Sequence, residues 1–315
     1  METLLITGVA GFIGSSVTRL FISKGYQVIG VDNLSTGSIT QLPEGIIFVK
    51  GDLSQETTFN DIPDITISTV IHIAGQSGGV PSWEDNVNDL ESNALAGLRV
   101  INFAISRGIK NIIYTSSMAV YGNPLSQPVK EKSKPNPLTP YAVSKLMVEY
   151  YLNVYKDYFD KIFILRLNNT YGHGQILNKM QQGMVRIFLS QAFNDRKIIV
   201  RGSLNRYRDF IYIDDVSNAI YLATISKIKG LETLNISNNL KTTVRELIDI
   251  ISAAIPFEIE VSVSETGTQG DQSGIYCDNS RAKKILNWKP ITSLEDGINS
   301  IVSETMKEYG KQYDK

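Results

Sequence analysis

The chain has 315 residues, 42% of them hydrophobic, which is enough for a main domain and a smaller second one with packed cores. Its 31 lysines and arginines nearly balance 32 aspartates and glutamates, which argues against a basic nucleic-acid-binding surface. One cysteine excludes an internal disulfide, two histidines favour no metal site, and no apolar run approaches the roughly 20 residues of a membrane span. We therefore expect a cytoplasmic protein without nucleic-acid or membrane partners.

The first half of the chain alternates short apolar runs with amphipathic segments. Strands are predicted at Thr3–Thr7, Gln27–Val31, Ile46–Lys50, Thr69–Ile73, Asn111–Thr115 and Lys161–Leu167, and helices at Ile13–Lys24, Val87–Arg107 and Tyr141–Tyr158. This alternation is typical of parallel β-α-β units, so we predict an α/β fold with a doubly wound parallel sheet, the Rossmann arrangement. Ligands of such sheets bind beyond the carboxyl ends of the strands.

After Leu167 the alternation becomes less regular. Shorter elements are predicted there: strands at Ile198–Val200, Phe210–Ile213 and Leu234–Ile236, helices at Met180–Phe193, Ile213–Thr224, Thr243–Ala254, Ser280–Leu286 and Leu294–Tyr309, and a loop at Glu265–Gly274. We expect residues 1–168 to form the Rossmann domain, with residues 206–237 returning to it. Residues 169–205 and 238–315 then form a smaller, mixed α/β C-terminal domain.

Three glycines in TGVAGFIG follow the first predicted strand and open the first helix: Gly8, Gly11 and Gly14. Glycine suits positions where a pyrophosphate approaches bare backbone, and the amino terminus of a helix attracts such an anion. A turn without a ligand is the alternative, and the strand before and the helix after the glycines count against it. Asp32 ends the second strand, where a carboxylate accepts hydrogen bonds from a ribose and repels a 2′-phosphate, so we expect NAD as cofactor.

A tyrosine and a lysine stand four residues apart in PYAVSK. This spacing places Tyr141 and Lys145 on one face of a helix that Pro140 can begin. An ammonium about 4 Å away could lower the pKa of the phenol by about three units, which general base catalysis at neutral pH requires. Ser117, after the fifth strand, could hold the reacting oxygen. Taken alone, such a pair is usually a solvated helix face and such a serine a turn former.

Eight segments occur in the order of one family: TGVAGFIGS, VDNLSTG, GDL, HIAG, YTSSMAVYG, PYAVSK, RLNNTYG and RDFIYIDDV. From residue 3 to about residue 297, the chain thereby resembles the extended short-chain dehydrogenase/reductases of the NAD-dependent epimerase/dehydratase family, most nearly the UDP-glucose 4-epimerase-like branch. The resemblance implies a Rossmann fold, NAD as cofactor and a nucleotide-sugar substrate bound by the smaller domain. It also implies a homodimer joined through the Val87–Arg107 and Tyr141–Tyr158 helices.

The resemblance assigns roles to individual residues. The catalytic triad would be Ser117, Tyr141 and Lys145. Cofactor contacts are expected at Gly8, Gly11, Phe12, Ile13, Gly14, Asp32, Asn33, Asp52, Leu53, Ala74, Gly75, Tyr141 and Lys145, and substrate contacts at Ser82, Ser117, Asn169, Arg208 and Asp271. Asn93 resembles the structural asparagine of the family. Thr268 replaces an arginine that usually clamps the pyrophosphate, and Arg206 could compensate.

The dehydratase branch of the family has an acidic pair where this chain has Ser117 and Met118, so the resemblance favours a redox-neutral reaction. We expect NAD-dependent epimerisation at C4 of a nucleotide sugar, most simply a UDP-hexose, through a 4-keto intermediate. Two alternatives stay open. One is a nucleotide-sugar dehydrogenase or reductase on the same scaffold, and the other is a non-catalytic NAD-binding regulator.

Overall fold

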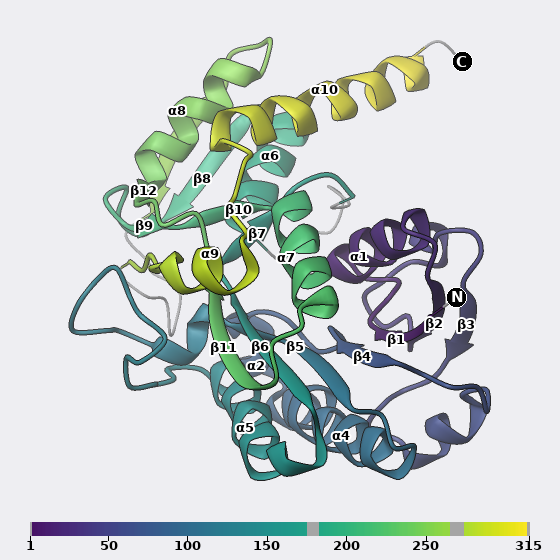
Figure 1. Cartoon of the computed structure of the whole chain (residues 1–315). Coiled ribbons are helices and arrows are strands. Elements are labelled where there is room, and N and C mark those ends of the chain that lie inside the picture. The colour runs from purple at the N-terminus through teal and green to yellow at the C-terminus, as the bar shows by residue number, and fades with distance from the viewer. Residues whose placement is uncertain (1, 175–182, 265–273, 314–315) are drawn as a thin grey trace.

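A seven-stranded sheet forms the centre of the computed structural model, which describes residues 2–174, 183–264 and 274–313 (Figure 1). The strands of this sheet are β1 (Thr3–Thr7), β2 (Gln27–Asp32), β3 (Ile47–Lys50), β4 (Thr69–His72), β5 (Asn111–Ser117), β6 (Lys161–Leu167) and β11 (Gly230–Ile236). Their order is β11-β6-β5-β4-β1-β2-β3, and every neighbouring pair is parallel. The predicted doubly wound Rossmann sheet is confirmed. The strand order reverses at β1, which lies between β2 and β4.

Helices cover both faces of the sheet (Figure 1). One face packs against α1 (Phe12–Ser23), α7 (Ile213–Ile225) and α9 (Ser280–Leu286), and the other against α4 (Ala96–Ser106) and α5 (Pro140–Val154). Phe21 and Trp288 are fully buried on the first face, and Val100 and Leu152 on the second. Burial on both faces explains why the strands are apolar along their whole length, and it leaves only the strand ends open to ligands.

A second hydrophobic core lies beyond the sheet, at the top of Figure 1. It is formed chiefly by α6 (Met184–Asp195), α8 (Val244–Ala254), α10 (Leu294–Tyr313), β8 (Lys197–Arg201) and β10 (Phe210–Tyr212). Helix α8 begins at a capping box, in which the side chains of Thr243 and Glu246 bond each other's backbone N–H groups. We propose that the domains divide as residues 1–168 with 206–237, and 169–205 with 238–315, although α9 packs on the sheet.

The expected helix over Val87–Arg107 is present, with a π-helical turn in its middle. It consists of α3 (Asn86–Asp89), a π-helical turn at Leu90–Leu95 and α4, which follow one another without a break. A π-turn hydrogen bonds with a different spacing from an α-helix, so hydrophobic periodicity alone could not reveal it. The glycine-rich segment before it also folds into a short helix, α2 (Gly79–Glu84). The predicted helix at Met180–Phe193 begins at Met184, after the non-helical N-cap Gly183, and residues 180–182 lie outside the described residues.

Four short strands were not predicted. They are β7 (Asn169–Tyr171), which pairs with β10, β9 (Tyr207–Arg208), which pairs with β12 (Thr242–Thr243), and β13 (Glu260–Ser264), which pairs with β8. Strands of two to five residues are too short to show a reliable alternation of apolar and polar side chains. Their partners stand far away in the sequence, so only the folded chain brings them together.

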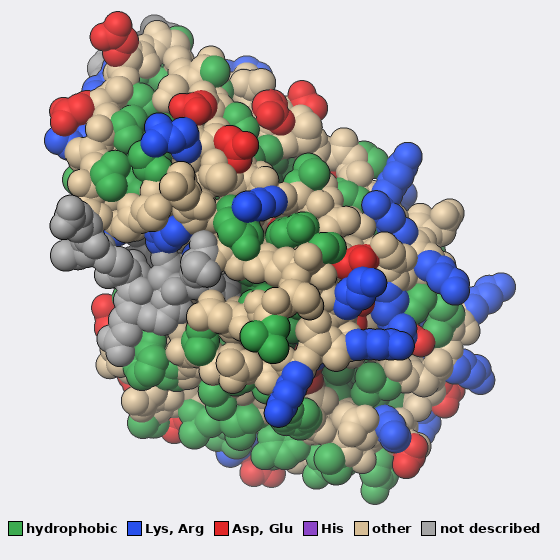
Figure 2. Space-filling model, turned by 90° about the vertical axis from the view of Figure 1, so that its left-hand side faces the viewer, with side chains coloured by type: hydrophobic (Ala, Val, Ile, Leu, Met, Phe, Trp, Pro, Cys, Tyr) green, Lys and Arg blue, Asp and Glu red, His purple; other side chains and the backbone are tan. Residues whose placement is uncertain are grey.

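Large hydrophobic side chains remain exposed on one side of the molecule. In Figure 2 they gather on the lower part of the face, which is the side on which α5 lies in Figure 1. Exposed members on α2, α3, the π-helical turn and α5 are Val80, Trp83, Val87, Leu90, Val143, Tyr150 and Val154. These helices pack beside one another, so the exposed side chains form one apolar surface. Among the described residues, no helix is both long and apolar enough to cross a membrane.

A buried ion pair fixes α5 to the sheet. The Glu149 carboxylate on α5 accepts hydrogen bonds from Arg166 on β6, at 2.5 Å from Nη2 and 3.0 Å from Nε. It also accepts a bond of 2.5 Å from the Ser116 hydroxyl on β5. Burial disfavours the charged form of Arg166, and the hydrogen bonds and charge of Glu149 outweigh this, so the arginine pKa is raised. This ion pair lies one helical turn after Lys145 and thereby fixes the position of α5 close to that residue.

Glu149→Gln is expected to lower the free energy of unfolding by about 3 to 5 kcal/mol, because it leaves a buried arginine without its counter-ion. Urea denaturation of the purified protein measures the change. The control is Glu260→Gln, which removes a partly exposed ion pair with Lys197 at 2.7 Å and should cost about 1 kcal/mol or less. Equal effects of the two substitutions would contradict the role of the buried pair.

Candidate active site

A cavity of about 1130 Å³ lies beyond the carboxyl ends of the sheet strands. The ends of β1, β2, β4, β5 and β6 supply one wall, and the start of α6 with β8–β10 supplies the other. Nearly all of the predicted cofactor and catalytic positions line it: Gly8, Gly11, Phe12, Ile13, Gly14, Asp32, Asn33, Asp52, Leu53, Ala74, Gly75, Ser117, Tyr141, Lys145, Asn169 and Arg208. The fold therefore gathers segments from across the chain in one place, at the point where strand order reverses.

The glycine turn after β1 has no room for side chains. Gly8 has a φ of +75°, and a Cβ there would lie 2.8 Å from the Ala74 nitrogen. A Cβ on Gly14 would lie 1.9 Å from the Gly8 carbonyl oxygen, so α1 can approach β1 only with glycine at that position. Gly11 caps α1 without a side-chain hydrogen bond, and the first turn of α1 contains no acidic residue. This helix amino terminus can therefore receive a pyrophosphate.

The end of β2 carries the carboxylate expected at an adenine ribose. Asp32 Oδ2 accepts a hydrogen bond of 2.9 Å from Ala10 N, and Oδ1 accepts one of 2.7 Å from Leu34 N. These bonds fix the carboxylate at the cavity, and each oxygen can still accept a ribose hydroxyl. The neighbouring Asn33 side chain donates to Asp52 at 3.3 Å. The residues present thus fit NAD, with the pyrophosphate at the glycine turn and the ribose at Asp32.

Three side chains meet at the ends of β5 and α5. Thr139 caps α5 by accepting a hydrogen bond of 3.2 Å from Ala142 N, and Tyr141 follows in the first turn. Ser117, the last residue of β5, lies beside the Tyr141 hydroxyl and acts to lower its pKa. Lys145, one turn further along α5, is 5% exposed, and its Nζ donates to the Thr115 carbonyl at 3.0 Å. The predicted Ser117, Tyr141 and Lys145 constellation is therefore present at the cavity.

The electrostatics of this group differ from the expectation. Burial raises the pKa of Tyr141 to about 12, and the neighbouring Ser117 side chain only partly opposes the rise. Burial also lowers the pKa of Lys145 to about 8, against the opposing charges of Asp89 and Glu149. Lys145 was expected to lower the pKa of Tyr141. For the protein without a cofactor this expectation is wrong, because desolvation of the phenol is the larger effect. A cationic nicotinamide ring would add a second positive charge at this position.

Asp89 is a buried acid of the site that the sequence analysis missed. One of its oxygens accepts a hydrogen bond of 3.0 Å from Asn93, and the other has no partner. Burial raises the pKa of Asp89, while the neighbouring side chains of Ser144 and Asn93 and the charge of Lys145 act to lower it. In the sequence, only the four-residue spacing between Asp89 and Asn93 could have indicated this contact. An acidic residue on a predicted helix is usually exposed to solvent.

The predicted substrate residues fall into three groups. Asn169 and Arg208 line the cavity, Asn169 at the start of β7 and Arg208 at the end of β9. Ser82 does not line it, because its side chain is buried within α2 and donates to the Gly79 carbonyl at 2.6 Å. Asp271 lies outside the described residues, as does Thr268.

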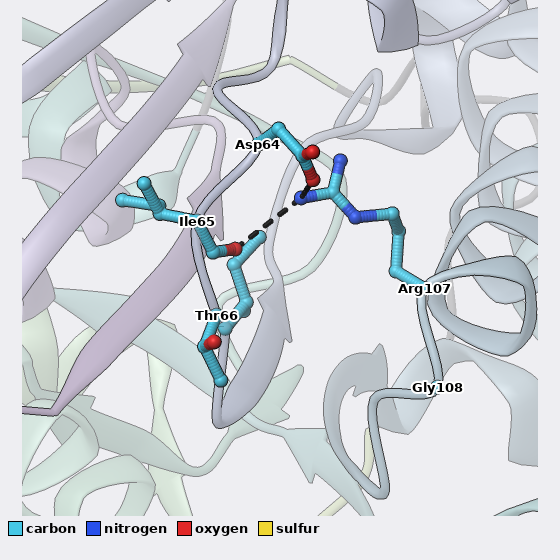
Figure 3. Close-up of a pocket in the computed structure, with 6 residues that line it drawn as sticks. Asp64, Ile65, Thr66, Arg107 and Gly108 are labelled. Carbon is cyan, nitrogen blue, oxygen red and sulfur yellow. Dashed lines mark hydrogen bonds and ion pairs between the residues drawn. The ribbon is translucent and has the colours of Figure 1, made fainter.

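A second, smaller cavity of about 250 Å³ lies near the amino-terminal side of β4 (Figure 3). Arg107 occupies it, with an ion pair of 2.9 Å to Asp64 and hydrogen bonds of 3.2 Å to the Pro63 and Ile65 carbonyls. The arginine is thus engaged with the protein itself, and this cavity offers no free group for chemistry. Within the described residues, no three His, Cys, Asp or Glu side chains are grouped so that they could hold a metal ion.

A model of the NAD dependent epimerase/dehydratase family matches residues 4–237. The chain belongs to this family. Its fold, glycine turn and Ser117, Tyr141 and Lys145 constellation agree with the predicted membership of the extended, UDP-glucose 4-epimerase-like branch. The chain is therefore an NAD-dependent enzyme of the nucleotide-sugar epimerase type, and its cofactor is NAD.

Known proteins similar to this chain carry more than one activity name. A protein named putative UDP-glucose 4-epimerase from Methanocaldococcus jannaschii is 34% identical, with 95% of this chain and 97% of the relative covered. A dTDP-4-dehydro-6-deoxyglucose reductase from Escherichia coli is 28% identical, with 95% and 96% covered. A UDP-glucose 4-epimerase from Thermotoga maritima, solved with UDP-glucose, superposes with a TM-score of 0.93 at 30% identity and covers 98% of this chain and 100% of its own.

Acid extracts of the purified enzyme are expected to contain NAD and not NADP, because the Asp32 carboxylate would repel a 2′-phosphate. Chromatography of the extract identifies the nucleotide. Asp32→Asn removes the charge and keeps one carbonyl acceptor, so the preference for NAD over NADP should fall about tenfold, or about 1.4 kcal/mol. Recovery of NADP from the unaltered enzyme would contradict the assignment of Asp32.

Tyr141→Phe is expected to lower kcat by about 100- to 10,000-fold, because it removes the hydroxyl that would transfer the proton. Folding and NAD content should stay unchanged, since only one oxygen is lost. Steady-state kinetics measure kcat, and Tyr158→Phe, at an exposed tyrosine beyond the end of α5, is the matched control. Near-normal activity of Tyr141→Phe would show that another group carries the proton.

Proposed function

We propose that the enzyme inverts the configuration at C4 of a nucleotide-linked hexose, with UDP as the carrier. The observation that carries the proposal is that Ser117, Tyr141 and Lys145 line one end of a cavity large enough for a cofactor and a substrate. A nucleoside diphosphate carrier would give the substrate-side wall of the cavity a group to bind while the sugar reacts.

The chain's own residues supply the proton transfer. Ser117 would hold the C4 oxygen while Tyr141 takes the proton of the C4 hydroxyl. NAD, held at the glycine turn and Asp32, would supply a reversible hydride acceptor, so the whole cycle would be redox-neutral. After the 4-keto sugar has turned over in the cavity, Tyr141 would return the proton to the same oxygen, and C4 would be reduced on its opposite face. This turning requires a firmly held nucleotide and a loosely held sugar.

The two walls of the cavity are suited to holding the nucleotide firmly and the sugar loosely. Arg208 lines the substrate side, and its Nη1 donates to the Tyr207 carbonyl at 2.8 Å, which holds the guanidinium in place at the end of β9. The sugar side includes Gln76 and the glycines Gly78 and Gly79, which add no bulk and no charge there. A stretch of wall made of small, uncharged residues leaves room for a sugar to rotate, which favours inversion over a single-face reduction.

The proposal predicts interconversion of a C4 epimer pair without added cofactor. UDP-glucose, UDP-galactose, their N-acetyl forms and UDP-glucuronate are incubated with the enzyme, and NMR follows the configuration at C4. TDP-, GDP- and CDP-sugars complete the panel. Accumulation of NADH in proportion to substrate would support a dehydrogenase in place of an epimerase. Absence of any C4 exchange across the panel would contradict the proposal.

We also propose that the enzyme is a homodimer joined through the apolar surface of α2, α3, the π-helical turn and α5. Val154 and Tyr150 on α5 are 71% and 59% exposed, and a second chain could bury them. Val100 and Ile101, on the helix that the resemblance places at the interface, are buried within the chain against the sheet. The proposal is supported instead by the exposed apolar residues on α2, α3, the π-helical turn and α5.

Light scattering at micromolar concentration should give twice the chain mass of 35.0 kDa. Val154→Glu should weaken dimerisation about 100-fold, or about 2.7 kcal/mol, because each protomer would bury an unpaired carboxylate. Val263→Glu, at an exposed valine on β13, is the control and should leave the mass unchanged. A mass of one chain for the unaltered enzyme would contradict the proposal.

A further inference from the structure

The substrate-side wall of the cavity is strongly basic. Four arginines line it: Arg186, Arg201, Arg206 and Arg208. Among the described lining residues of this wall, between positions 183 and 210, there is no aspartate or glutamate. The acidic lining residues Asp32, Asp52 and Glu84 belong to the segments around the sheet. The wall is therefore complementary to an anionic ligand.

Arg186 differs from Arg206 and Arg208 because two of its guanidinium nitrogens have no hydrogen-bond partner. Its Nε and Nη2 are buried, and neither has a hydrogen-bond partner. Burial lowers the pKa of Arg186, and no neighbouring charge contributes to the shift. Arg206 and Arg208, by contrast, donate to the backbone carbonyls of Ser203 and Tyr207. A half-buried cation without a partner costs free energy in the ligand-free protein.

The position of Arg186 in α6 adds to that cost. It is the third residue of the helix, after the N-cap Gly183, which makes no side-chain cap, and the first turn contains no acidic residue. The amino terminus of a helix carries a partial positive charge, which disfavours a cation and favours an anion. Burial and the helix dipole both act against a cation at Arg186 in the free protein. An anion in the cavity would offset both effects.

We propose that Arg186 binds a phosphate of the substrate's nucleoside diphosphate. This rests on the proposed function. Because Nε and Nη2 have no bonds to break, that edge of the guanidinium can turn to the cavity and bind two phosphate oxygens at once. A diphosphate carries more negative charge than the single carboxylate of a uronic acid, so it fits four arginines better.

Titration calorimetry of the holoenzyme with uridine, UMP and UDP tests the inference, using Arg186→Gln beside the unaltered enzyme. The substitution should weaken UDP binding about 10- to 100-fold and leave uridine binding within about twofold. It should also raise the nucleotide-free Tm by about 2 °C, because an unpaired cation is removed. Arg245→Gln is the control, since Arg245 is an exposed arginine on α8 that does not line the cavity.

UDP affinity of Arg186→Gln within about twofold of the unaltered enzyme would overturn the inference. So would an equal loss for uridine and UDP, which would mean that the side chain contacts the base. An unaltered enzyme that binds none of UDP, TDP, GDP and CDP would overturn it as well. Diphosphate binding that depends on Arg186 in an enzyme without C4 exchange would leave this inference standing and remove the proposed function.

Discussion

The arrangement of the site depends on burial of both faces of the parallel sheet. Because helices cover each face, a ligand can reach the sheet only where the strands end. All neighbouring strands run in the same direction, so the residues that follow β1, β2, β4 and β5 are brought to one edge. The glycine turn, Asp32, Ala74 and Ser117 are therefore neighbours in space, although more than a hundred residues separate the first from the last.

The fold holds several charged or polar groups in positions that are unfavourable in the free protein. Lys145 is buried with a pKa lowered to about 8, and Tyr141 with one raised to about 12. Arg186 has no partner for two of its nitrogens. The buried ion pair of Glu149 and Arg166 and the bond from Lys145 to Thr115 hold the surrounding helix in place. Charged or polar groups held in such positions can interact directly with the charge of a bound ligand.

The two walls of the cavity differ in how they arise from the sequence. The cofactor wall consists of short motifs, each made by a strand end with the turn that follows it or by the start of a helix, so TGVAGFIG or PYAVSK identifies its own part. The substrate wall is assembled from α6 and strands of two to five residues whose pairing partners are remote. Asn169 and Arg208 belong to the motifs RLNNTYG and RDFIYIDDV, but Arg186 lies outside the recognised motifs and gave no signal before the chain was folded.

The sequence by itself determined the class of fold, and it indicated the glycine turn, Asp32 and the group of Ser117, Tyr141 and Lys145 that the fold brings to one cavity. These depend on local periodicity, helix caps and fixed spacings, which short segments contain. Only the tertiary structure decided that Asp89 is buried near Lys145, that Ser82 turns into α2, and that burial raises the pKa of Tyr141. Burial and long-range contacts decide these features, and both depend on where distant parts of the chain pack.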